Sequence, residues 1–178
     1  ETFARAGYLA VAIAHPRRQP DDYTALCDAL QVQEGILCGV YINWDRPHDV
    51  QHVLDWLEAP PADLVGLADT DHIGYLGHGD GASSVMMALG ATRNFKCAQA
   101  YTATQDCQIA DLTTISDERV DIGIVLSPVG PGDYGFMRQS YGNLRRPLLF
   151  VTGLADGTSA DVANRLETWS LMPAGDKY

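Results

Sequence analysis

Short runs of small, β-branched and other apolar residues recur along the chain and predict buried β-strands. The first run, GYLAVAIAH at residues 7–15, is apolar at nearly every position, as expected for a strand covered on both faces. Three later runs have the same character and lie at residues 73–76, 122–126 and 148–152. Each of these three leads into a loop that contains glycine, which marks the end of a strand.

Between these runs the apolar residues recur at helical spacing. The clearest stripe lies between Pro47, which fits the first turn of a helix, and Pro60, which stops it. Its members, at i, i+3, i+4 and i+7, are Val50, Val53, Leu54 and Leu57. Residues 81–91, GASSVMMALGA, predict a tightly packed helix, and residues 21–32 predict a short one. A last helix is predicted from the spacing of Val162, Leu166 and Trp169.

Strands that alternate with helices predict an α/β protein with a mainly parallel sheet, helices on both faces and right-handed crossovers. Residues 1–178 contain no internal repeat, low-complexity tract or interdomain linker, so we expect a single domain. The segment GVYINW is irregular or strand-like, and residues 93–118 are polar and only weakly periodic.

Charge and composition narrow the classes of partner. A formal net charge of −11 predicts a solvated acidic surface and argues against nucleic acid, which clustered Lys and Arg would bind. No apolar stretch approaches the roughly 18–20 residues that cross a bilayer, so we expect no transmembrane segment and a soluble protein. No signal peptide is visible, which leaves a cytoplasmic location or secretion after removal of a leader. Oligomeric state stays open.

The four cysteines have no Cys-x-x-Cys spacing, and we predict no metal site. Cys97 and Cys107 bracket a polar segment, and an oxidising compartment would allow a disulfide between them. Free thiols are the alternative for all four. His48 and His52 have the i, i+4 spacing of a metal pair, but no third ligand is evident and an exposed helix face is favoured.

The segment IGYLGHGDGASSVMMALG contains the most distinctive turn of the chain. An apolar strand, a Gly-x-x-x-Gly turn and a helix of small residues form the nucleophile elbow of α/β-hydrolases, in which serine is the central residue. Here the two framing glycines are Gly77 and Gly81, and the centre is Gly79. Because ligands of parallel sheets bind at the carboxyl ends of the strands, this turn and the loops SPVGPGDYGF and GLADGTS are the candidate site loops.

Five segments in this order resemble a branch of the α/β-hydrolase superfamily, the predicted dienelactone hydrolases and platelet-activating-factor-acetylhydrolase-like esterases and lipases. They are GYLAVAIAHP, RPHDVQHVLDWL, HIGYLGHGDGASSVMMALG, ERVDIGIVLSPVGP and RPLLFVTGLADGT with RLETWSLMPAGDKY. The resemblance covers nearly the whole chain. It implies an α/β-hydrolase fold that is incomplete at both ends, so that residues 1–178 are an interior fragment without the early strands or the C-terminal histidine segment.

The resemblance also implies a Ser-Asp-His mechanism through an acyl-enzyme on a small-molecule or lipid-like ester, with no cofactor. By position, Gly79 takes the place of the nucleophile, Asp156 is the triad acid, and the backbone N–H of Asp80 is an oxyanion donor. Gly77, His78 and Gly81 frame the elbow. Without the serine and the histidine, the chain as given is expected to be inactive.

Other assignments of these residues stay open. Asp80 could be the nucleophile, although His78 would then occupy a position that wants glycine, and Ser83 and Ser84 lie inside the following helix. Asp156 fits an ordinary Asp-Gly turn or a helix cap as well. His15, His72 and His78 are each more easily structural than catalytic.

Two functions therefore follow from the sequence. The first is a carboxylic-ester hydrolase lineage whose nucleophile is replaced by glycine, by nature or by engineering. The second is a catalytically inactive relative that binds a ligand or a partner. A nucleotide site is the weakest alternative, because Gly77, Gly79 and Gly81 are followed by Ser84 where a dinucleotide fingerprint has glycine or alanine.

Overall fold

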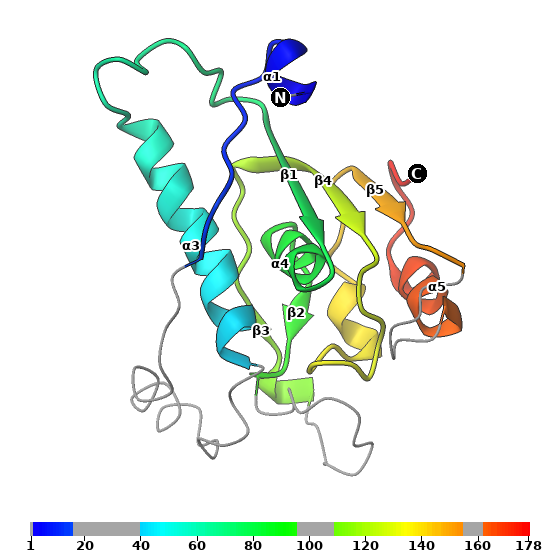
Figure 1. Ribbon diagram of the computed structural model, residues 1–178. Coiled ribbons are helices and arrows are strands. Elements are labelled where there is room, and N and C mark those ends of the chain that lie inside the picture. Colours follow the sequence, from blue (N-terminus) through cyan, green and yellow to red (C-terminus); the bar gives the residue numbers. More distant parts are fainter. Residues whose placement is uncertain (1, 16–39, 96–108, 155–161) are drawn as a thin grey trace.

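The computed structural model describes residues 2–15, 40–95, 109–154 and 162–178, with only the backbone at 40–43. The described chain is a mixed α/β structure (Figure 1). Its helices are α1 (Thr2–Arg5), α3 (Val40–Glu58), α4 (Asp80–Ala88) and α5 (Val162–Leu171), with the short 3-10 turns η4 (Ile109–Asp111) and η5 (Arg138–Tyr141). Its strands are β1 (Ile73–His78), β2 (Thr92–Arg93), β3 (Thr113–Thr114), β4 (Val120–Leu126) and β5 (Leu148–Val151).

The main sheet consists of three parallel strands in the order β1-β4-β5, which confirms the predicted parallel α/β class (Figure 1). Its register pairs His78 with Leu126 and Leu126 with Val151. The last residues of all three strands therefore lie side by side. This edge is the one at which α/β proteins bind ligands, and the turn that follows β1 begins there. β2 and β3 form a separate antiparallel pair.

One face of the main sheet holds the core. Helix α4 packs on this face, and its apolar residues Ala82, Val85, Met86 and Met87 have no exposed surface. Glycine at position 123 of β4 lets α4 approach the sheet closely, because a Cβ there would lie 2.8 Å from Cγ1 of Val85. Helix α3 packs against α4 through its predicted stripe, of which Val50 and Leu54 are buried. The methionines are thus core residues, as expected of flexible gap-filling side chains.

The prediction of helices on both faces is wrong for the described residues. α4 contacts the face of Gly123 and Leu148, and α5 reaches the same face through the ring contact of Phe150 with Trp169. No described helix covers the opposite face, where the outward-pointing Leu76 and Ile122 are 44% and 43% exposed. Periodicity predicts a helix but carries no information about the side of the sheet on which it packs.

The predicted strand at residues 7–15 is also wrong. The segment after Gly7 is neither helical nor paired with a strand, and most of it is exposed. Ile13 packs against the core, and His15 Nδ1 lies 2.7 Å from Oδ2 of Asp49 on α3. The apolar pattern of a strand is present, but no neighbouring described strand supplies the ladder hydrogen bonds that a strand requires.

Helix α3 begins earlier than predicted, at Val40, so GVYINW is helical from its second residue and Pro47 lies inside the helix. Helix α5 forms as predicted, but two polar residues are buried on it and two of the three apolar residues that predict it are exposed. Leu166 is 50% and Trp169 38% exposed, whereas Arg165 and Thr168 are buried. The hydroxyl of Thr168 donates to the carbonyl of Val129, so polar contacts with the loop after β4 determine which side of α5 faces inward.

An ionic cluster fastens the amino end of β4 to the neighbouring helices. Arg119 donates to Asp117 through its main-chain N–H and its guanidinium, and it also pairs with Asp55 and Glu58 of α3. Asp117 in turn donates its main-chain N–H to the carbonyl of Ala88 at the end of α4. The hydrogen bonds from Arg119 lower the pKa of Asp117 below its usual range.

We expect Asp117→Asn to lower the free energy of unfolding by about 1–2 kcal/mol at pH 7, because a charged acceptor of the Arg119 bonds is replaced by a neutral amide. Since the folded pKa of Asp117 is lowered, its contribution is present above the unfolded pKa and is lost as the pH falls through the folded pKa. Urea unfolding of both proteins at pH 7 and pH 3 tests this. An equal difference at the two pH values would contradict it.

Among the described helices, none is both long and apolar enough to span a membrane.

Candidate functional site

The turn between β1 and α4 has an unusual backbone conformation. Gly79 has φ 56° and ψ −118°, a combination that residues with a side chain rarely adopt. Two hydrogen bonds hold it there, from its N–H to the carbonyl of Leu126 on β4 and from the N–H of Ser83 to its carbonyl. The first bond continues the sheet and the second begins the helix. Glycine adopts this conformation freely, whereas a residue with a side chain would be strained there, as residues at functional sites often are.

The surroundings of the three glycines differ. A Cβ on Gly77 would lie 2.2 Å from the carbonyl oxygen of Gly81, so β1 and α4 cross with no room for a side chain there. A Cβ on Gly79 meets nothing within 4 Å. A side chain at this position would stand clear of the turn at the carboxyl edge of the sheet. The turn thus has room for one projecting side chain at position 79, but the residue there is glycine and has no side chain.

The amino end of α4 adds hydrogen-bond donors beside Gly79. The first N–H groups of a helix have no acceptor within it, and they carry the positive end of the helix dipole. Asp80 is the first residue of α4, so its N–H belongs to this group. Donors in this place would suit a developing oxyanion. The role of Asp80 as an oxyanion donor remains an expectation.

Two arginines interact with the carboxylate of Asp80, one by an ion pair and one electrostatically. Arg46 of α3 lies 3.6 Å from it, with Nη1 facing Oδ2, and the electrostatic interaction between Asp80 and Arg93 is favourable. The Asp80 side chain is 42% exposed in its contact with Arg46. This ion pair is partly exposed and therefore weak.

Arg93 of β2 is fully buried, which is rare for a guanidinium. Its Nε donates to the carbonyl of Tyr134, and its guanidinium carbon lies 5.5 Å and 5.0 Å from the ring centroids of Phe95 and Phe136. Its two terminal nitrogens have no hydrogen-bond partner among the residues that the structure describes. Burial lowers the pKa of Arg93 to about 9. The two rings offset part of the cost of burying this charge.

The hydroxyls inside α4 are not presented at the turn. Ser83 and Ser84 are buried, and the hydroxyl of Ser84 donates to the carbonyl of Asp80. Tyr75 of β1 lies nearby, where burial raises the pKa of its hydroxyl to about 12 and a hydrogen bond with Ser84 opposes this rise. At neutral pH the Tyr75 hydroxyl is therefore protonated.

The loop after β4 lies beside the turn and is itself strained. Ser127 and Tyr134 both have φ 49°, although neither is glycine. The N–H of Ser127 donates to Val151, which fixes the loop to the end of β5. Further along, burial raises the pKa of Asp133, whose carboxylate accepts a hydrogen bond from Asn164 of α5. The bond from Ser127 to Val151 places the start of this loop at the carboxyl edge of the sheet, where the sequence predicts a candidate site loop.

The described histidines have structural surroundings. His78 is exposed and ends β1, and His72 pairs with Asp69 before β1. A hydrogen bond with Asp69 raises the pKa of His72. His48 bonds the carbonyl of Trp44, as expected of a residue on a helix face. No described contact brings a histidine to Gly79.

Several predicted features lie outside the described residues. These are Asp156, the predicted helix at 21–32 and the cysteines Cys27, Cys38, Cys97 and Cys107. Within the described ranges, no group of three or more His, Cys, Asp or Glu side chains is placed to hold a metal ion.

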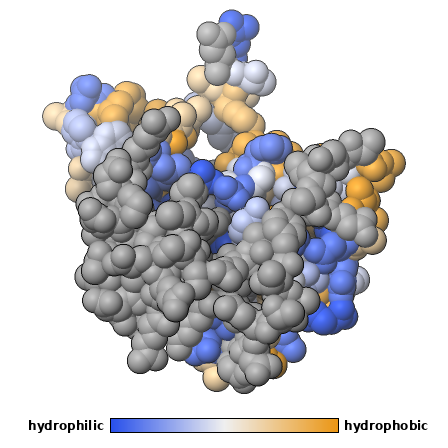
Figure 2. Space-filling model, turned by 60° about the horizontal axis from the view of Figure 1, so that its bottom comes forward, coloured by the Kyte–Doolittle hydropathy of each residue, from blue (hydrophilic) through white to orange (hydrophobic). Residues whose placement is uncertain are grey.

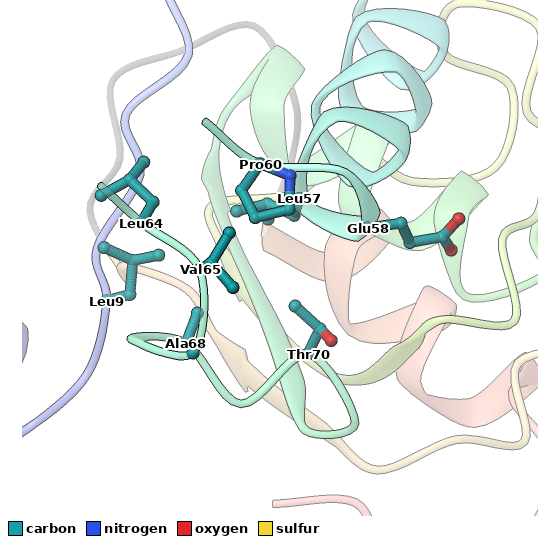
Figure 3. A pocket seen from close by; sticks show the side chains of 9 residues that line it. Leu9, Leu57, Glu58, Pro60, Leu64, Val65, Ala68 and Thr70 are labelled. Atoms are coloured by element: carbon teal, nitrogen blue, oxygen red, sulfur yellow. The ribbon is translucent and has the colours of Figure 1, made fainter. Parts of the chain in front are cut away.

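A cavity of about 210 Å³ lies at the opposite end of the molecule (Figure 3). It is formed by the end of α3, the connection that leads to the start of β1, and Leu9.

Figure 2 shows the end of the molecule toward which the strands point, where hydrophilic and hydrophobic patches alternate over the described surface. Neither view indicates a class of substrate for the turn.

The sequence predicts the turn and its glycines, but it does not predict that Arg46 and Arg93 interact with Asp80. Arg46 is hidden because helical spacing alone does not show that α3 passes the turn. Arg93 lies in a weakly periodic segment, and a single buried arginine there produces no recognisable sequence pattern.

Comparisons with family models, with curated proteins and with solved structures found no match.

Proposed function

We propose that the chain belongs to a carboxylic-ester hydrolase lineage and that Gly79 occupies the position of its serine nucleophile. The observation that carries the proposal is the backbone of Gly79, held at φ 56° and ψ −118° between a parallel strand and a helix, with open space where a side chain would project. Glycine adopts this conformation without the penalty that a Cβ would impose, and the conformation brings no packing contact because the residue has no side chain. It is useful where a nucleophile must stand out of the chain.

The chemistry follows from the same geometry. A serine hydroxyl at position 79 would attack the ester carbonyl, and the N–H groups at the start of α4 would stabilise the oxyanion that forms. The resemblance assigns the acid to Asp156 and leaves the histidine unassigned. With glycine at position 79 no acyl-enzyme can form, so we expect the chain as given to show no esterase turnover.

The alternative function is ligand binding or interaction by an inactive relative. The observation that favours it is the ion pair of Asp80 with Arg46 beside the turn, together with the favourable electrostatic interaction between Asp80 and buried Arg93. A protein that has lost catalysis would keep such a scaffold if it still recognised a ligand.

Hydrolysis of a short-chain p-nitrophenyl ester distinguishes the two functions. We expect the unchanged protein and Gly79→Ala to stay at background. With added imidazole as the base in place of the unassigned histidine, we expect Gly79→Ser to exceed the alanine variant under the same conditions by at least about tenfold. Alanine is the matched control because it imposes the same backbone strain without the hydroxyl. Equal rates for the serine and alanine variants would contradict the hydrolase lineage and favour the binding protein.

A further inference from the structure

The start of helix α4 has hydrogen-bond donors with room for an acceptor beside them. The N–H groups of the first helical turn have no acceptor within the helix. Gly79, which precedes the helix, has no side chain that could accept from them. A Cβ on Gly79 or on Gly81 meets nothing within 4 Å, so the space beside these donors is open. A small acceptor therefore fits at this helix end.

Arg93 brings a second set of donors without acceptors. Its side chain is fully buried, and both of its terminal nitrogens lack a hydrogen-bond partner among the residues that the structure describes. Its strongest electrostatic interaction with a charged group is with Asp80, the first residue of α4, which places its guanidinium close to the same helix end. Since buried donors in native proteins are nearly always bonded, an unpartnered guanidinium points to a bound ion or water, and its charge selects an anion.

Arg46 of α3 reaches the start of α4 as well. Its Nη1 lies 3.6 Å from Oδ2 of Asp80, and its buried Nε has no partner within the described parts of the chain. The side chains of Arg46 and Asp80 are 24% and 42% exposed, so solvent reaches this pair. A partly exposed ion pair is weak, and an incoming anion can compete with Asp80 for the guanidinium.

The charges that act on this helix end favour an anion. Arg46 and Arg93 act on it against the carboxylate of Asp80, and Arg93 is charged at pH 7 because its pKa is about 9. Asp49 lies one helical turn after Arg46, but its Oδ2 is held by Nδ1 of His15 at 2.7 Å. The positive end of the α4 dipole adds to the attraction.

We infer that the start of α4 binds a small oxyanion, the carboxylate or phosphate group of a ligand, through the guanidinium groups of Arg46 and Arg93 and the first N–H groups of the helix. The fork of a guanidinium donates to two oxygens of such a group at once, and helix amino ends are established phosphate sites. The bound charge is a permanent part of the ligand, and its binding needs no side chain at position 79. The inference therefore holds for a hydrolase and for a binding protein alike.

Titration of the unchanged protein with sodium phosphate, and separately with sodium acetate, tests this site. Sodium chloride holds the ionic strength constant, and backbone amide chemical shifts are followed by NMR. We expect saturable shifts of the Asp80 and Gly81 amides with at least one anion and a dissociation constant on the order of 1 mM. Tighter binding of phosphate assigns a phosphate-bearing ligand to the site, and tighter binding of acetate assigns a carboxylate.

Two variants and one control locate the site. Arg46→Gln and Arg93→Met should each weaken the tighter anion by at least about tenfold, because each removes charge-assisted hydrogen bonds. The matched control is Arg138→Gln, since Arg138 is 64% exposed on η5 and pairs with Glu167, and it should leave the affinity unchanged. Circular dichroism verifies folding. The partly exposed Arg46 keeps the test decisive if Arg93→Met fails to fold.

Three results would overturn the inference. One is the absence of a saturable shift at the start of α4 with either anion up to about 50 mM. Another is an unchanged affinity in folded Arg46→Gln, and the third is an equal loss in Arg138→Gln. A failure of Gly79→Ser to hydrolyse an ester would contradict the hydrolase lineage instead, because the titration uses the chain with glycine at position 79.

Discussion

Replacing Gly77 by alanine is expected to lower the free energy of unfolding by about 3–5 kcal/mol, the largest stability effect of any single methyl group added at this turn. The new Cβ would lie 2.2 Å from the carbonyl oxygen of Gly81 and 2.7 Å from the backbone nitrogen of Ala82. Both atoms belong to the backbone of α4 and have no rotamer through which to move away. Relief requires α4 to shift by about 1 Å relative to β1, against a core without free space.

Gly81→Ala is the matched control for this change. A Cβ at Gly81 meets nothing within 4 Å, and the residue lies inside α4 with an ordinary backbone. Alanine there should therefore raise stability by up to about 1 kcal/mol, because it restricts the unfolded chain and favours the helix. Urea unfolding of both variants measures the contrast. Equal stability of Gly77→Ala and Gly81→Ala would show that the strand and the helix do not cross closely.

The two framing glycines are therefore not equivalent. The Gly-x-x-x-Gly pattern does not distinguish them, because it requires glycine at both positions. The structure assigns the steric requirement to Gly77 and leaves Gly81 free. A pattern of glycines shows that two segments approach each other, but it does not show which residue lies at the point of contact.

The parts of the fold that the sequence predicts well are those with strong local signals. Strands β1, β4 and β5 and helix α4 lie where the apolar runs place them, because buried parallel strands and a packed helix need continuous apolar residues. The segment at 7–15 has an equally strong run and forms no strand, since strand formation also depends on a neighbour. A local sequence pattern does not show whether a neighbouring strand is present.

The candidate site shows the same division. The turn at Gly79 can be predicted from residues 77–81 alone, because its geometry depends on local backbone conformation. The positions of Arg46 and Arg93 around Asp80 depend on how α3 and β2 pack, which spans the chain. The orientation of α5 also depends on packing, because Thr168 faces inward to bond Val129.

The reactivity of a cysteine at position 79 tests most directly whether this turn presents and activates a nucleophile. A thiol there would lie at the amino end of α4, where the helix dipole favours the thiolate, and the nearest carboxylate, Asp80, is already paired with Arg46. The matched control is Gly132→Cys, which has a comparable positive φ of 92° and open space around its Cβ but lies in a loop.

The measurement is the rate of alkylation by iodoacetamide as a function of pH, resolved by peptide mass spectrometry so that the native cysteines are counted separately. We expect the thiol pKa in Gly79→Cys to lie about one unit below that in Gly132→Cys, and alkylation at pH 7 to be about tenfold faster. A thiol at position 79 with the same or a higher pKa and no faster alkylation would contradict a nucleophile position at Gly79.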